Sequence, residues 1–134
     1  MSLAVIDASA IVAFLAFDDP RGHHVGARLR AGDVFHAPSI LDYEVLGALR
    51  GLARKDARLD DTYAEACIRE LELFPVRREG IASLRRRIWA LRHNLTVYDA
   101  AYVALAEKLN ATLVTCDEKF ARSAGIGCRI ETIS

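Results

Sequence analysis

Short apolar runs alternate with longer segments of helical periodicity along the whole chain. Strands are expected at residues 3–6, 34–37, 74–76, 112–116 and 128–133. Helices are expected at residues 10–17, 23–30, 40–53, 60–73, 81–93, 96–109 and 118–123. Strands that alternate with helices, with no clear hairpin turn between them, are typical of a parallel sheet covered on both faces. The pattern therefore predicts an α/β fold with a central, mostly parallel sheet.

Local signals refine this outline. Residues 18–22 are expected to form a loop, because they combine Asp, Pro and Gly. Ser39 is expected to cap the helix at 40–53. That helix is apolar around much of its circumference, which indicates burial on more than one side, against the core and against a partner. Three aromatic side chains are expected in the core rather than as base-stacking platforms: Trp89, Tyr98 and Tyr102.

The bulk composition excludes several classes of protein. The 134 residues fit one compact domain, 1–134, and 52% of them are hydrophobic, which is ordinary for a globular chain. Lys plus Arg and Asp plus Glu number 18 each, so the chain is not a broadly basic binder. No apolar run approaches the roughly 20 residues of a membrane helix, and no signal peptide is evident. We therefore expect no membrane association.

The cysteines and histidines carry no obvious site. Cys67, Cys116 and Cys128 are far apart and form no C-x-x-C pair, which favours reduced thiols in a cytoplasmic protein over disulfides or zinc ligands. The four histidines have no evident acid–base partner and are expected at the surface or in loops: His23, His24, His36 and His93.

Two basic regions stand out in the sequence. The denser one contains Arg77, Arg78, Arg85, Arg86, Arg87 and Arg92. The second contains Arg50, Arg54, Lys55 and Arg58. Exposed arginines on helices are commonly just a solvated face, so these are candidate phosphate contacts only, with Arg85, Arg86, Arg87 and Arg92 the main ones.

Four carboxylates occupy positions where chemistry is expected. Asp7 directly follows the first strand, and Asp117 directly follows the strand at 112–116. Ligands of parallel α/β sheets bind beyond the carboxyl ends of the strands. Glu44 lies inside an apolar helix, where an unpaired carboxylate is costly, and Asp99 lies in the first turn of the helix at 96–109.

Each acid also has a purely structural interpretation. Asp7 and Asp117 would serve as helix N-caps. Asp99 would form a capping box with Thr96, three residues earlier. Glu44 would form a buried ion pair with an arginine. All four together favour another interpretation, because clustered acids repel one another and a divalent cation relieves that repulsion.

The chemistry of such a cluster is phosphodiester hydrolysis. Oxygen-only ligands suit Mg²⁺, with Mn²⁺ as a substitute, and do not suit zinc. A bound metal lowers the pKa of a water molecule and stabilises charge on the phosphate, so no side-chain nucleophile is needed. The sequence therefore predicts a catalytic and metal-binding site of Asp7, Glu44, Asp99 and Asp117.

The segments around these acids resemble the motifs of PIN-domain nucleases. The similar segments are residues 5–10, 38–45, 95–106 and 113–117, in the family's order and near its spacing. The third segment is fairly specific to this family, and the ordered set of four segments makes the resemblance strong. The resemblance covers the whole chain and implies a three-layer α/β/α domain. Ser9 and Thr115 match hydroxyl positions that support the acidic site.

The short length resembles the VapC-type toxins of toxin–antitoxin pairs. That resemblance implies a magnesium-dependent endoribonuclease that acts on RNA, often tRNA or rRNA. It also implies a homodimer and a cognate antitoxin that covers the site, commonly with an arginine reaching the acids.

Three other functions remain as alternatives. The family includes nucleases of RNA processing and decay, and a catalytically inactive interaction module is also conceivable. An aspartyl-phosphate phosphatase or receiver is disfavoured, because the phosphatase needs a second acid where Ser9 stands and the receiver's neighbouring acids are missing.

Overall fold

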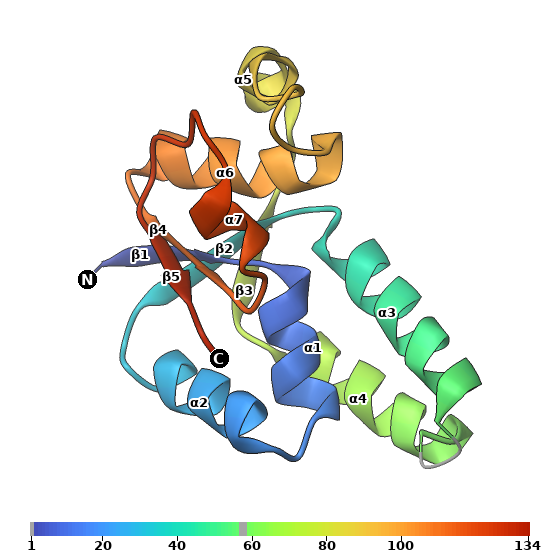
Figure 1. Ribbon diagram of the computed structural model, residues 1–134. Helices are drawn as coiled ribbons and strands as arrows, with labels where there is room; N and C mark the ends of the chain where they lie inside the picture. Colours follow the sequence, from blue (N-terminus) through green and yellow to red (C-terminus); the bar gives the residue numbers. More distant parts are fainter. Residues whose placement is uncertain (1, 57–58) are drawn as a thin grey trace.

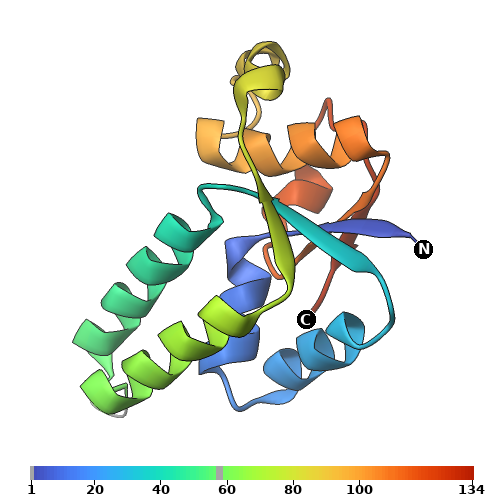
Figure 2. The same ribbon diagram turned by 180° about the vertical axis from the view of Figure 1, so that it is seen from behind.

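Five parallel strands form the central sheet, in the order β3-β2-β1-β4-β5. The computed structural model describes residues 2–56 and 59–134 (Figures 1 and 2). The strands are β1 (Leu3–Ile6), β2 (Val34–Pro38), β3 (Val76–Glu79), β4 (Thr112–Thr115) and β5 (Ile130–Thr132). Each pairing between neighbouring strands is parallel, which confirms the predicted sheet.

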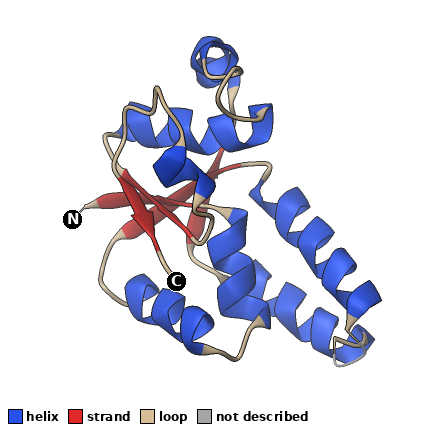
Figure 3. Cartoon of the chain, viewed as in Figure 1, coloured by secondary structure: helices blue, strands red, loops and turns tan. Residues whose placement is uncertain are grey.

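Helices cover both faces of this sheet and complete the three-layer fold (Figures 1 and 3). One face is covered by α6 (Val97–Leu109), and α5 (Arg85–Ala90) packs on its outer side. The other face is covered by α1 (Ala8–Ala16), with α2 (Pro20–Leu29), α3 (Leu41–Lys55) and α4 (Asp61–Leu73) packed around it. The short elements are the 3-10 turn η1 (Ala82–Leu84) and α7 (Lys119–Arg122).

The middle of the sheet is apolar on both sides, as a central parallel strand requires. Ala4, Val5 and Ile6 of β1 are completely buried. Every residue from 100 to 106 in α6 is buried as well, and its alanines let the helix lie close to the sheet. Asn110 ends α6 in the left-handed conformation, with φ at 52°.

Several predicted element boundaries were wrong. The segment 18–22 is not all loop, because α2 begins at Pro20, a residue suited to the first helical position. Ser39 does not cap α3, which begins at Leu41 without a side-chain cap. The predicted helix at 81–93 is a 3-10 turn followed by the shorter α5. The weak strand expected at 74–76 lies at 76–79 instead.

Predictions of burial failed where the outcome depends on tertiary contacts. Only one face of α3 is buried, through Leu41, Val45 and Leu49. Trp89 and Tyr98 are 63% and 61% exposed, because they lie on outward faces of α5 and α6. Tyr102 is in the core as expected. His36 is buried in β2, 3.4 Å from Glu79 of β3, rather than at the surface.

The three cysteines are free thiols, as expected, with Cys67 buried and Cys116 and Cys128 partly buried. Within residues 2–56 and 59–134, no helix is both long and apolar enough to cross a membrane. Arg58, part of the second predicted basic region, lies outside the described residues.

Candidate active site

Asp7 lies at the carboxyl end of β1, where it begins α1. Its Oδ1 accepts a hydrogen bond from the backbone N–H of Ala10 at 3.0 Å, so the predicted N-cap role is real. The same carboxylate accepts bonds from two hydroxyls, Thr115 Oγ1 at 2.6 Å and Ser9 Oγ at 2.8 Å. Only 5% of Asp7 is exposed. The residue is therefore a cap and, at the same time, a buried carboxylate held in one orientation.

Burial controls the protonation of Asp7. Loss of solvation raises the pKa of Asp7 from 3.8 to about 6, and the negative charge of Asp117 contributes to the rise. Hydrogen bonds from Thr115, Ala10 and Ser9 act in the opposite direction but do not outweigh burial. A carboxylate in this position is stabilised by a nearby cation.

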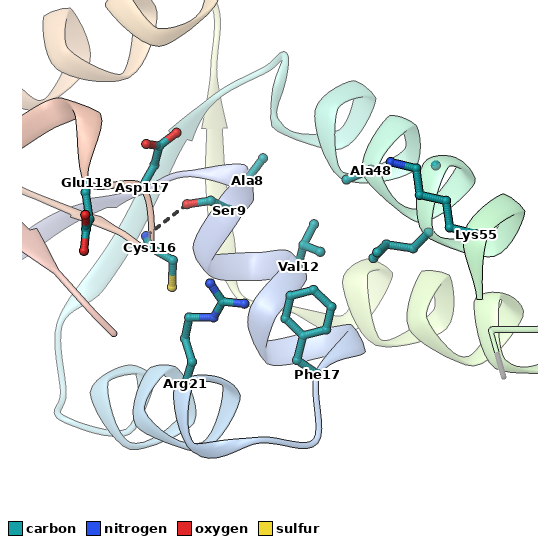
Figure 4. Close-up of a pocket in the computed structure, with 12 residues that line it drawn as sticks. Ala8, Ser9, Val12, Phe17, Arg21, Ala48, Lys55, Cys116, Asp117 and Glu118 are labelled. Carbon is teal, nitrogen blue, oxygen red and sulfur yellow. Dashed lines mark hydrogen bonds between the residues drawn. The ribbon is translucent and has the colours of Figure 1, made fainter.

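Thr115 and Ser9 connect the ends of two neighbouring strands. The Thr115 hydroxyl accepts a bond from the backbone N–H of Asp117 at 2.9 Å. The Ser9 hydroxyl accepts one from the N–H of Cys116 at 2.9 Å (Figure 4). The two hydroxyls lie 3.2 Å apart. These bonds fix the position of Asp117 relative to Asp7, although more than a hundred residues separate the two along the chain.

Lys119 joins Asp117 to Asp99. Its ammonium lies 2.8 Å from Asp99 Oδ2 and 3.1 Å from Asp117 Oδ2. Burial lowers the pKa of Lys119, but its bonds to the two aspartates outweigh this and raise it. Asp117 Oδ1 also accepts the backbone N–H of Lys119 at 3.0 Å, although the N-cap of α7 is Glu118. Asp117 therefore stabilises a local turn through this bond and does not cap α7.

Asp99 and Thr96 bond each other, but the Asp99 carboxylate accepts from the Thr96 hydroxyl and not from the backbone N–H that a capping box uses. Thr96 caps α6 by accepting the N–H of Asp99 at 3.1 Å, and its hydroxyl donates to Asp99 Oδ2 at 3.0 Å. The same Oδ2 faces Lys119, so the cap does not use up this carboxylate. Asp99 therefore has both a structural bond and a charge directed toward the other acids.

The carboxylate of Glu44 contacts a tyrosine. The hydroxyl of Tyr102 donates to Glu44 Oε1 at 2.6 Å, and no arginine of residues 2–56 and 59–134 forms the ion pair of the structural interpretation. Burial, the bond to Glu44, and the negative charges of Glu44, Asp7 and Asp99 all raise the pKa of Tyr102 far above its ordinary value. Three carboxylates thus act on one buried hydroxyl, which brings Glu44 and Asp99 into the neighbourhood of Asp7.

The donor set suits a hydrated magnesium ion. Within the described parts of the chain, no three His, Cys, Asp or Glu side chains form a preassembled metal cage. Magnesium does not require one, because it usually keeps several waters and takes one or two carboxylates. The ammonium of Lys119 between Asp99 and Asp117 shows that these acids accommodate a positive charge. The residues present therefore fit a divalent cation bound partly through water.

The sequence analysis did not predict two residues that contact the acids of the site, Tyr102 and Lys119. Tyr102 is one turn beyond Asp99 on α6, a spacing that could have placed its hydroxyl beside the acids. Lys119 offered no comparable signal, because a lysine two residues after an acid is ordinary on a surface helix.

None of the four main candidate phosphate contacts forms an ion pair with the four acids within the described residues: Arg85, Arg86, Arg87 and Arg92. Arg85 and Arg86 are exposed on α5, which packs on the outer side of α6 (Figure 1). Arg87 is occupied by an ion pair with Glu107 at 2.6 Å, and Arg92 stacks over the exposed ring of Trp89 at 4.4 Å. These arginines form a surface on and next to α5 and do not belong to the acidic cluster.

A groove runs between α1 and α3 up to the acidic cluster (Figure 4). It has a volume of about 670 Å³. Its walls are mostly apolar, with Val12 and Phe17 from one side and Leu52 from the other. Ser9 and Asp117 also line it, so it is continuous with the site.

Comparison with known proteins identifies close relatives of the whole chain. A family model described as PIN domain matches residues 4–126. Ribonuclease VapC3 of Mycobacterium tuberculosis is 44% identical over 119 residues, covering 89% of this chain and 85% of the relative. Ribonuclease VapC12 of the same organism is 40% identical over 132 residues, covering 98% and 100%.

Solved structures share the fold. VapBC2 from Rickettsia felis, bound to a DNA fragment from its promoter, matches with a TM-score of 0.71 at 16% identity, covering 98% of this chain and 99% of that one. VapC20 of Mycobacterium tuberculosis, a Sarcin-Ricin loop cleaving toxin, matches with a TM-score of 0.69 at 21% identity, covering 93% and 96%.

Proposed function

This chain is a nuclease of the PIN-domain family, and on that premise we propose that it is a Mg²⁺-dependent endoribonuclease and the toxin of a VapBC-type pair. One observation carries the catalytic part of the proposal. Asp7 and Asp117 are linked through Thr115, and Lys119 bridges Asp117 to Asp99. Glu44 bonds the hydroxyl of Tyr102, a group that also experiences the negative charges of Asp7 and Asp99. Three acids from distant parts of the sequence thus share one network of bonds, and the fourth lies within electrostatic reach of it.

The proposed roles of the acids come from the resemblance to PIN-domain nucleases. Asp7 and Asp99 would hold the divalent ion, and Glu44 and Asp117 would complete the acidic site. Ser9 and Thr115 orient Asp7 through their hydroxyl bonds. When bound, the ion supplies a water of lowered pKa for attack on the phosphorus and positive charge for the phosphate oxygens.

We propose RNA as the substrate, with tRNA or rRNA as the expected class. The exposed arginines Arg85, Arg86 and Arg92 contact backbone phosphates outside the acidic cluster. Arg87 contributes less, because Glu107 already occupies its guanidinium. The protein acts in the cytoplasm, as a homodimer and as one nuclease domain.

The groove between α1 and α3 is the proposed seat of the antitoxin. Its apolar walls suit an amphipathic helix, and its polar end at Ser9 and Asp117 lets a basic side chain reach the acids. Solved structures with this fold include VapBC2 from Rickettsia felis and a toxin–antitoxin complex from Klebsiella pneumoniae, and these support an antitoxin as a partner of this chain.

RNA cleavage with and without metal tests the proposal. Wild type should cleave total RNA with Mg²⁺ or Mn²⁺, and EDTA should stop it. Asp99→Asn should remove at least about 99% of the activity, because it deletes a proposed ligand. Asp61→Asn is the matched control, since Asp61 also lies in the first turn of a helix but far from the acids.

A wild type that is as inert as Asp99→Asn with Mn²⁺ supplied would favour an inactive interaction module. Cleavage that persists in EDTA would contradict the role of the metal.

A further inference from the structure

Lys119 occupies the position of a cation within the acidic cluster. Among the residues that the structure describes, it is the one basic side chain in ion-pair contact with any of the four acids. Its ammonium reaches Asp99 at 2.8 Å and Asp117 at 3.1 Å at the same time. A second positive charge cannot share those oxygens at the same distances without repulsion.

The protein keeps this lysine close to the site by a backbone contact. The N–H of Lys119 donates to Asp117 Oδ1, while its ammonium faces Asp117 Oδ2. Its side chain is nevertheless 49% exposed, on a helix of only four residues. The long side chain can therefore rotate into solvent while the backbone bond stays in place.

We propose that Lys119 is a resident cation that neutralises Asp99 and Asp117 in the metal-free protein and must leave them when a divalent ion binds. Metal binding is then an exchange of one cation for another. Lys119 weakens the apparent affinity for metal and stabilises the empty site. This rests on the proposed function in one respect, that the metal uses Asp99 or Asp117.

Metal affinity and thermal stability test the exchange. Lys119→Met keeps an unbranched side chain of similar length and removes the charge. Titration calorimetry with Mn²⁺ should give a dissociation constant about tenfold lower for this variant than for wild type. Its melting temperature should fall in EDTA but match wild type in saturating Mn²⁺, because the ion replaces the missing charge.

Two further variants test whether the effect depends on the charge at position 119 and not on any cation of α7 or on the choice of replacement. Arg122→Met removes a cation from the same short helix, but Arg122 pairs with Glu118 and not with the site. It should leave the affinity for Mn²⁺ within about twofold of wild type. Lys119→Gln repeats the loss of charge with a polar side chain and should tighten binding as Lys119→Met does.

Unchanged or weaker Mn²⁺ binding by both folded Lys119 variants would overturn the exchange and leave the proposed nuclease standing. Equal destabilisation with and without Mn²⁺ would reduce Lys119 to a structural role and would also overturn it. Absence of Mn²⁺ binding in wild type and variants alike would overturn both this inference and the metal dependence of the proposed function.

Discussion

Asp7 and Asp60 begin helices with nearly the same local geometry, in very different surroundings. Asp7 Oδ1 accepts the N–H of Ala10 at 3.0 Å, and Asp60 Oδ1 accepts the N–H of Tyr63 at 2.9 Å. Asp60 is exposed and belongs to the start of α4. Asp7 is buried and also bound by Thr115 and Ser9.

The difference separates a structural role from a functional one. A helix cap does not require aspartate, since asparagine, serine and threonine cap comparably. Burial of the charge adds nothing to capping and carries a cost, because loss of solvation raises the pKa of Asp7. On the proposed function, the buried carboxylate of Asp7 binds a cation, whereas Asp60 only begins α4.

When each aspartate is replaced with asparagine, the two variants should differ most in their rates of RNA cleavage. Asp7→Asn keeps the cap but removes the charge, so kcat/KM should fall about a thousandfold, equivalent to about 4 kcal/mol of lost transition-state stabilisation. Asp60→Asn should stay within about twofold of wild type. Steady-state cleavage of a labelled RNA measures both. Equal activity of the two variants would mean that Asp7 is only a cap.

The pH dependence of stability should also differ between the Asp7 and Asp60 variants, but by a smaller amount. The pKa of Asp7 is raised in the folded state, to about 6, so its favourable contribution is complete below about pH 4 and is lost as the pH rises through about 6. At about 1.4 kcal/mol per pH unit, the charged form costs about 3 kcal/mol above that range. Metal-free Asp7→Asn should therefore be more stable than wild type at pH 7.5, by up to that amount.

Urea unfolding in EDTA at several pH values measures the difference, which should vanish near pH 4. Asp60→Asn should track wild type throughout. A variant Asp7→Asn that is less stable than wild type at pH 7.5 would contradict the cost of burying this charge.

The smallest expected effect concerns two tyrosines, one beside each region. Tyr102→Phe removes the hydroxyl that bonds Glu44 at 2.6 Å but keeps the buried ring, so it should cost about 1 kcal/mol and several-fold in kcat/KM. Tyr63→Phe removes a longer bond, 3.3 Å to the carbonyl of Ala16, near Asp60. Thermal melts and cleavage rates of both variants would show whether only the first affects catalysis.

The fold and the positions of the acids were predictable because both depend on local pattern. Apolar runs alternating with helices predicted the parallel sheet, and carboxyl ends of neighbouring parallel strands must share one edge. Asp7 and Asp117 follow β1 and β4, which are indeed neighbours. Asp99 was recognisable from its position after Thr96 and within a family-like segment.

Contacts made by long or amphipathic side chains were not predictable. The same α3 pattern that suggested burial on several sides leaves Tyr43 and Leu46 exposed, because no other element of the described chain covers that face. The partner of Glu44 could not be predicted, because the hydroxyl of Tyr102 reaches it from α6, 58 residues further along the chain. The contacts of Lys119 with Asp99 and Asp117 depend on its side-chain rotamer, which the sequence pattern does not predict.

The bond between Thr115 and Asp7 spans 108 residues, and this has a consequence for synthesis on the ribosome. A nascent chain exposes Asp7 almost at once, but its hydroxyl partner is added only when most of the protein has been translated. The carboxylate proposed to be catalytic therefore lacks this bond in an unfinished chain. On the proposed function, RNA cleavage requires the late strand β4 to have paired with β1, so each new copy becomes active only after most of it has been translated.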